Sequence, residues 1–200
     1  MEANLINSAT SVIVLHEIYG VNQHIINAAH KFRNAGYDSC CPDLLGLNRP
    51  FLYHEQQKAY KYFIDKIGFA EAALQVQALS AREKSKGYES VILCGYSIGA
   101  TIAWLCSQDK NVAGVIGFYG SRIRDYLHIT PQCPALLVFP TQEKAYDVQS
   151  FAGSIKKDNV KVHVLEGSHG FADPFSSEYN PSSCFKTDLL VKNFMESFIK

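Results

Sequence analysis

The chain has 200 residues, of which 47% are hydrophobic and 19% are charged. These proportions are typical of a globular protein, and the length predicts one domain, residues 1–200, with a sizeable hydrophobic core. The 19 basic and 19 acidic side chains cancel, so there is no net charge to attract nucleic acid or an anionic membrane. We therefore expect neither nucleic acid nor membrane as a partner.

The amino terminus lacks the basic start and the unbroken apolar stretch of a secretory signal, so a cytoplasmic protein is expected. In that compartment cysteines are normally reduced, and no C-x-x-C pair indicates zinc. We therefore expect free thiols and no metal site. The six cysteines are Cys40, Cys41, Cys94, Cys106, Cys133 and Cys184.

Apolar runs alternate with segments of helical spacing along the chain. Residues 11–15 are apolar and β-branched, which is typical of a buried strand, and residues 22–34 form a helical pattern that stops before Gly36. A long helical pattern covers residues 58–85, and Gly68 is expected to divide it. Further strands are expected at 37–41, 91–94, 112–119, 135–139 and 160–165, and further helices at 98–108, 148–156 and 189–199.

This alternation predicts an α/β fold with a mostly parallel sheet and helices on both faces. In such folds the functional side chains lie in the loops at the carboxyl ends of the strands. The loops that follow Leu15, Cys94, Phe139 and Leu165 are therefore the places to search for a site.

The sequence Gly95-Tyr96-Ser97-Ile98-Gly99 lies between a predicted strand and a predicted helix. In this context G-x-S-x-G indicates a nucleophilic serine on a turn too tight for side chains at the flanking positions. The amino terminus of the helix offers N–H groups and a positive dipole end to a developing oxyanion. The sequence thus predicts Ser97 as the nucleophile.

A serine nucleophile needs a histidine base and an acid that orients it, and in this fold they follow the serine in the order acid, then histidine. His169, in the loop after the last strand, satisfies this order. His163 falls within a strand, and the other histidines come too early in the chain: His16, His24, His30, His54 and His128.

The sequence offers two acids after the strand at 135–139. Glu143 lies in the loop directly after the strand, and Asp147 comes four residues later, where a helix cap is a common use of Asp. Glu143 is preferred, with Asp147 as the alternative. Glu17, after the first strand, is either an ordinary loop charge or a partner of the nucleophile.

The chain resembles the dienelactone hydrolase family. The resemblance is carried by residues 12–22, 35–37 and 41–46, by the serine motif, by Gly117-Phe-Tyr-Gly120, by residues 134–143 and by Gly167-Ser-His-Gly-Phe171, in this order. It implies an α/β-hydrolase fold with no metal and no organic cofactor. It also implies that Glu17 contacts the resting nucleophile, that the N–H groups of Ile18 and Ile98 form an oxyanion hole, and that Glu143 is the acid.

Three features depart from the pattern of this family. Ser97 replaces the cysteine of its founding members, and Glu143 stands where Asp is usual. Members specific for dienelactones have an arginine shortly after the histidine, whereas this chain has Asp173 in that region. The departures favour ester or lactone hydrolysis in general over dienelactone hydrolysis in particular.

The expected activity is hydrolysis of small carboxylic esters or lactones by a Ser97-His169-Glu143 triad in an open site. The alternatives are a small-acyl thioesterase or peptidase, and a non-catalytic module that binds a small ligand. Four aromatic residues are expected either as walls of the pocket or as core: Tyr19, Tyr96, Tyr119 and Phe171.

Overall fold

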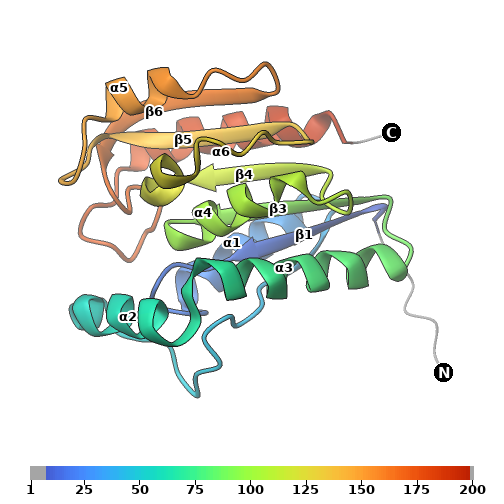
Figure 1. Cartoon of the computed structure of the whole chain (residues 1–200), viewed down its shortest axis with the longest axis horizontal. Coiled ribbons are helices and arrows are strands. Elements are labelled where there is room, and N and C mark those ends of the chain that lie inside the picture. Colours follow the sequence, from blue (N-terminus) through green and yellow to red (C-terminus); the bar gives the residue numbers. More distant parts are fainter. Residues whose placement is uncertain (1–7, 199–200) are drawn as a thin grey trace.

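A computed structural model describes residues 8–198 of the chain. Six parallel strands form one sheet in the order β2-β1-β3-β4-β5-β6 (Figure 1). The prediction of an α/β fold with a parallel sheet is confirmed. The strands are β1 Thr10–Leu15, β2 Asp38–Cys40, β3 Ser90–Tyr96, β4 Gly114–Phe118, β5 Ala135–Gln142 and β6 Val160–Ser168.

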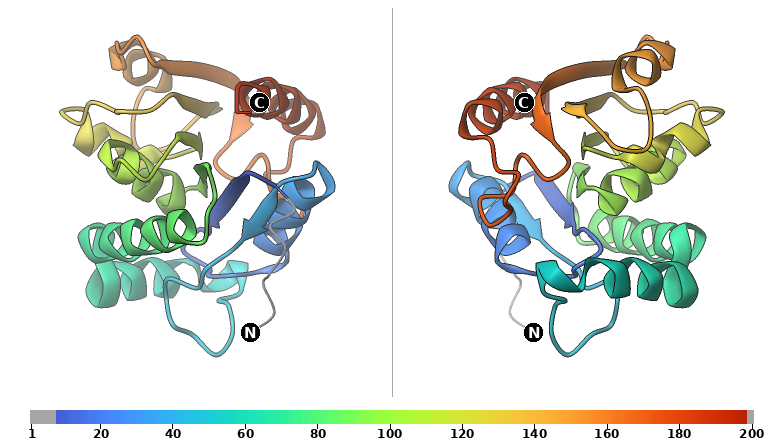
Figure 2. Two further views of the ribbon diagram at one scale, coloured as in Figure 1. Left: turned by 90° about the vertical axis from the view of Figure 1, so that its right-hand side faces the viewer. Right: turned by 90° about the vertical axis from the view of Figure 1, so that its left-hand side faces the viewer.

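Helices cover both faces of this sheet. On one face lie α1 (Gln23–Asn34) and α6 (Pro181–Glu196); on the other lie α3 (Gly68–Ser85), α4 (Ile98–Leu105) and α5 (Val148–Ser154) (Figure 2). The alternation along β1 explains this arrangement, since Val12 and Val14 pack with α1 while Ile13 and Leu15 pack with α3 and α4. None of the helices within residues 8–198 is long and apolar enough to cross a membrane.

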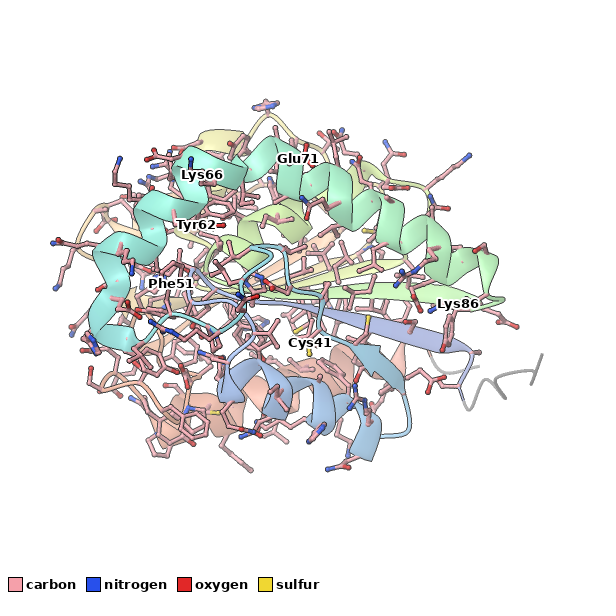
Figure 3. All side chains as sticks on the ribbon, turned by 90° about the horizontal axis from the view of Figure 1, so that it is seen from below. Cys41, Phe51, Tyr62, Lys66, Glu71 and Lys86 are labelled. Carbon is pink, nitrogen blue, oxygen red and sulfur yellow. The ribbon has the colours of Figure 1, made fainter. Side chains whose placement is uncertain are left out.

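The helical stretch after β2 is divided, as predicted, at Gly68. It consists of a 3₁₀ turn at Tyr53–Glu55, α2 (Gln56–Tyr62), a π-helical turn at Phe63–Ile67 and then α3, where Gly68 has a φ of 70°. A non-glycine residue adopts this φ only with strain. Figure 3 shows α2 and α3 above one face of the sheet, with Phe51 and Tyr62 near α2, and these two rings meet edge to face at 5.7 Å.

The last helix begins earlier than predicted. Asn180 caps α6 by accepting a hydrogen bond from the Ser183 N–H at 3.0 Å, and Pro181 occupies the first turn. The predicted start at residue 189 is therefore wrong, and residue 199 lies outside the described residues. Two further 3₁₀ turns, Cys106–Gln108 and Ser121–Tyr126, follow α4 and β4. All six cysteines are free thiols, as expected.

The turn between β3 and α4 is packed against β1 without room for side chains. A Cβ on Gly95 would lie 2.2 Å from the Gly99 carbonyl carbon, and a Cβ on Gly99 would lie 2.4 Å from the Leu15 oxygen. Between these glycines, Ser97 has a φ of 53°, which is rare for a non-glycine residue. Both glycines of the motif are thus required by backbone contact, and the turn projects Ser97 from the sheet.

We expect Gly99→Ala to lower the free energy of unfolding by about 1–3 kcal/mol or more, because its Cβ meets backbone that cannot rotate away. Gly153→Ala is the matched control, since a Cβ at Gly153 has no neighbour within 4 Å. That change should raise stability by about 0.5–1 kcal/mol, as alanine favours helix. Urea unfolding of both variants measures the difference, and equal stabilities would contradict this account of the turn.

Candidate active site

The carboxyl ends of β1, β3, β5 and β6 meet at a cavity of about 1150 Å³. It is lined by Glu17 and Ile18 after β1, Ser97 and Ile98 after β3, Glu143 after β5 and His169 after β6, together with loop residues that include Tyr19 and Tyr53. Segments from positions 17 to 169 of the chain therefore converge here. Parallel strands bring about this convergence because their carboxyl ends share one edge of the sheet.

A chain of hydrogen bonds joins three of the predicted side chains. The Nε2 of His169 lies 2.8 Å from the Ser97 Oγ, and its Nδ1 lies 2.7 Å from the Glu143 Oε1. An ionised Glu143 can only accept, so Nδ1 carries the proton and Nε2 is free to accept from the serine hydroxyl. In this arrangement the His169 Nε2 can accept the hydroxyl proton of Ser97.

Asp147 has a different task. Its side chain accepts a hydrogen bond of 2.7 Å from the Ser150 N–H and so caps the amino terminus of α5. The hydrogen bonds that the Asp147 carboxylate accepts from Ser150 lower its pKa. Of the two acids that the sequence offered, the structure brings Glu143 to His169 and places Asp147 on a helix.

The charges around His169 make it more basic. Burial by itself lowers the pKa of the imidazole, but the hydrogen bond and charge of Glu143, with the charge of Glu17, raise it overall. A stronger base takes the proton of a serine hydroxyl more readily, provided that the base is not already protonated at the working pH.

Ile18 and Ile98 line the same cavity as Ser97. Ile98 is the first residue of α4, so its N–H has no acceptor within the helix. Ile18 follows β1 and lines the same cavity, next to a turn in which the Gly20 N–H bonds the Glu17 oxygen at 3.2 Å. The position of both residues is compatible with the oxyanion hole that the family resemblance implies.

Glu17 is a buried carboxyl group, with 4% of its surface exposed. Burial raises its pKa to about 7, and the nearby charge of Asp173 adds to this effect. The His169 ring and the Tyr119 hydroxyl act in the opposite direction. Glu17 is therefore not an ordinary loop charge, because a solvated glutamate would titrate near pH 4.3.

Sequence reasoning missed the role of His16. This fully buried ring contacts the Glu17 carbonyl oxygen through Nδ1 at 2.6 Å, and its Nε2 accepts the Leu44 N–H at 3.0 Å. Because Nε2 accepts a hydrogen bond, the ring is neutral with its proton on Nδ1, and burial lowers its pKa. His16 thus holds the loop of Glu17 and Ile18. The only signal was its position directly after a buried strand.

Comparison with known proteins identifies the family of this chain. The model of the dienelactone hydrolase family matches residues 2–199. The chain belongs to the dienelactone hydrolase family. It is 35% identical over 192 residues to the uncharacterized protein YczH of Bacillus subtilis, with 94% of both chains covered.

Two further matches show how far the similarity extends. The carboxymethylenebutenolidase of Pseudomonas putida is 27% identical, with 88% of this chain and 80% of the relative covered. A crystal structure from Klebsiella pneumoniae, proposed to be a dienelactone hydrolase, superposes with a TM-score of 0.78 at 17% identity and covers 96% of this chain and 88% of that one. The latter likeness supports the fold alone.

Asp173 lies in the loop after β6, four residues beyond His169. Its carboxylate is 1% exposed and accepts hydrogen bonds from the Tyr53 hydroxyl at 2.6 Å and the Phe175 N–H at 2.8 Å. These bonds connect the loop after His169 to the segment before α2. Asp173 is therefore a buried link between loops.

Of the four aromatic residues proposed as pocket walls, only Tyr19 lines the described cavity. Tyr96 packs on Phe118 with parallel rings 4.5 Å apart, on the side of α1 and α6. Tyr119 and Phe171 are fully buried, with Tyr119 behind the His169 ring at 4.9 Å. Tyr96, Tyr119 and Phe171 therefore lie in the core, which is one of the two settings that the sequence left open for them.

We expect Glu143→Gln to lower the pKa of His169, because burial remains while the charge and the acceptor that raise it are lost. Asp147→Asn is the matched control and should leave this pKa unchanged, since Asp147 bonds only within the cap of α5. Titration of the histidine rings followed by NMR measures both effects. A larger shift in the Asp147 variant would assign the partner of His169 to the wrong acid.

Proposed function

We propose that this protein hydrolyses small carboxylic esters or lactones, with Ser97 as nucleophile, His169 as general base and Glu143 as the acid that orients it. The observation that carries the proposal is the unbroken hydrogen-bond chain from Ser97 through His169 to Glu143 at the bottom of a cavity. Membership of a hydrolase family supports the same reaction class. No metal or organic cofactor is needed for it.

In the first half of the reaction, Ser97 Oγ attacks the carbonyl carbon of the ester while His169 Nε2 takes its proton. The N–H groups of Ile18 and Ile98 stabilise the negative charge on the carbonyl oxygen; loss of one such donor typically costs about 10²–10³ in rate. The intermediate then expels the alcohol, which receives the proton from His169. An acyl group remains on Ser97, and in a lactone the alcohol stays attached to it.

In the second half, water attacks the acyl carbon while His169 again accepts a proton. The intermediate collapses to the carboxylic acid, and the proton returns to Ser97. Glu143 stays ionised throughout and stabilises the protonated imidazole. Every proton is thus transferred through one imidazole, whose two nitrogens are already placed for the task.

The class of substrate follows from the family and from the charges of the cavity. The relative from Pseudomonas putida is named for a butenolide, which is a lactone. Glu17 and Asp173 both line the cavity in this chain, and two carboxyl groups disfavour an acyl group that is itself anionic. We therefore propose uncharged esters and lactones as substrates.

A fluorophosphonate probe tests the nucleophile directly. We expect the wild type to be labelled at Ser97, and Ser97→Ala to abolish labelling and to lower kcat on a p-nitrophenyl ester by about 10⁴-fold or more. Ser121→Ala is the matched control, because Ser121 lines the same cavity and should remain dispensable.

The outcomes separate the candidate functions. A folded protein that is never labelled would be a binding module rather than an enzyme. Labelling at Ser97 combined with turnover of thioesters or peptides, but not of esters or lactones, would contradict the proposed substrate class.

The pH dependence should follow the base. Because His169 must be neutral to accept a proton, kcat/KM should rise with pH through a midpoint above the usual histidine value of about 6.5. The negative charge of Glu17 helps to raise that pKa, so Glu17→Gln should move the midpoint to lower pH. Glu71→Gln, on the exposed side of α3, should not. A midpoint that stays or rises in the Glu17 variant would contradict this coupling.

A further inference from the structure

Behind the proposed triad lies a second cluster of buried polar side chains. We propose that Glu17, His24 and Asp173 form a binding site for one divalent transition-metal ion, of which Zn²⁺ is the best match. Each offers one ligand atom, and these three atoms lie within 4.8 Å of one another. One imidazole with two carboxylates is a donor set that suits zinc and its neighbours in the first transition series.

The distances leave space for an ion between the side chains. The Nδ1 of His24 lies 3.7 Å from the Asp173 Oδ1, too far for a hydrogen bond. Two ligands of a tetrahedral zinc ion, each about 2.0–2.1 Å from the metal, lie about 3.3–3.5 Å apart. A small contraction would therefore bring this pair into a shared coordination sphere.

His24 lacks the partners that a buried imidazole normally has. It is 3% exposed, and its Nε2 has no hydrogen-bond partner among the described residues. Its ring is held in place from the side by Tyr96, edge to face at 4.6 Å. The ring is thus held by packing rather than by a hydrogen bond at Nε2, and its Nδ1 is the nitrogen that faces Asp173 and can serve as a ligand.

The charge of the cluster also calls for a cation. Glu17 and Asp173 are 4% and 1% exposed, and the charged groups that act on Glu17 within residues 8–198 are His169 and Asp173, with no lysine or arginine. His24 is the one basic side chain within 4.0 Å of the Asp173 carboxylate in the described part of the chain. A bound cation would compensate the negative charge that two carboxyl groups this deeply buried carry when ionised.

Asp173 already has the supporting bonds that metal ligands usually show. The Tyr53 hydroxyl donates to its Oδ2 and the Phe175 N–H donates to its Oδ1. Such outer bonds fix the orientation of a ligating carboxylate, and their loss typically weakens metal affinity about 10- to 100-fold. Since Glu17 and Asp173 also line the large cavity, an ion has a route into the site and water can complete its coordination.

Titration of the metal-free protein with Zn²⁺ by isothermal calorimetry tests the site, and Co²⁺ absorption spectra report the coordination. We expect one ion per chain, with binding at least tenfold weaker in His24→Phe, which keeps the ring that packs on Tyr96. His30→Gln, an exposed histidine on the same helix, is the control and should bind as the wild type does. Tyr53→Phe should bind about 10- to 100-fold more weakly.

Three results would overturn the proposal. It fails if the folded wild type binds no Zn²⁺, if the His24 and His30 variants bind Zn²⁺ equally well, or if the protein prefers Mg²⁺ or Ca²⁺ over Zn²⁺. If His24→Phe does not fold, as judged by circular dichroism, Tyr53→Phe decides alone, and unchanged affinity there would refute the site. Ser97→Ala should bind the ion like the wild type, so the metal test stands even if Ser97 is not a nucleophile.

Discussion

The candidate site depends on one backbone contact, the approach of β1, β3 and α4 at the two glycines of the serine motif. With Gly95 and Gly99 in place, the α4 backbone comes so near to β1 that an added Cβ would lie 2.4 Å from the Leu15 oxygen. Two backbone hydrogen bonds hold Ser97 in its strained conformation. Its N–H donates to the Phe118 carbonyl oxygen at 2.9 Å, and its carbonyl oxygen accepts the Thr101 N–H at 3.3 Å. The contact therefore places Ser97, the first N–H of α4 and the loop after β1 together.

The loops at the site also bring acidic side chains close to the imidazole of His169. Glu143 binds the Nδ1 of His169, whereas Glu17 acts on the same ring through its charge. Glu17 is itself kept from ionising fully by burial and by Asp173. The basicity of His169 thus depends on three loops that are far apart in sequence, and His16 and Tyr53 fix two of these loops by hydrogen bonds.

The fold and the position of the serine turn could be predicted from the sequence, because both depend on local sequence patterns. Alternating strands and helices dictate a parallel sheet, and a G-x-S-x-G turn between them is readable without structure. The choice between Glu143 and Asp147 was different, since both follow the same strand, and only the three-dimensional path shows that Asp147 caps α5. A preference was possible, but it could not be decided from order along the chain.

The aromatic residues show one limit of sequence reasoning, which is that chain position does not give the direction of a side chain. Tyr96 adjoins Ser97, yet it ends a strand whose alternation turns it toward α1 and α6. The early start of α6 is a different kind of error, because the capping signal of Asn180 and Pro181 was present and was outweighed by the apolar pattern further on. His16 gave almost no signal, since its two partners are backbone groups.

The presence of serine where founding members of the family have cysteine gives the cluster of acids a physical meaning. A thiolate can be held ionised before substrate arrives, but a serine hydroxyl must lose its proton during the attack. That step favours a more basic imidazole, which is what the charges of Glu143 and Glu17 produce. The same charges cost activity at low pH, where His169 is already protonated. Burial of Glu17 limits this cost, because its pKa of about 7 lets it lose its charge as the pH falls, and the pull on the imidazole then weakens.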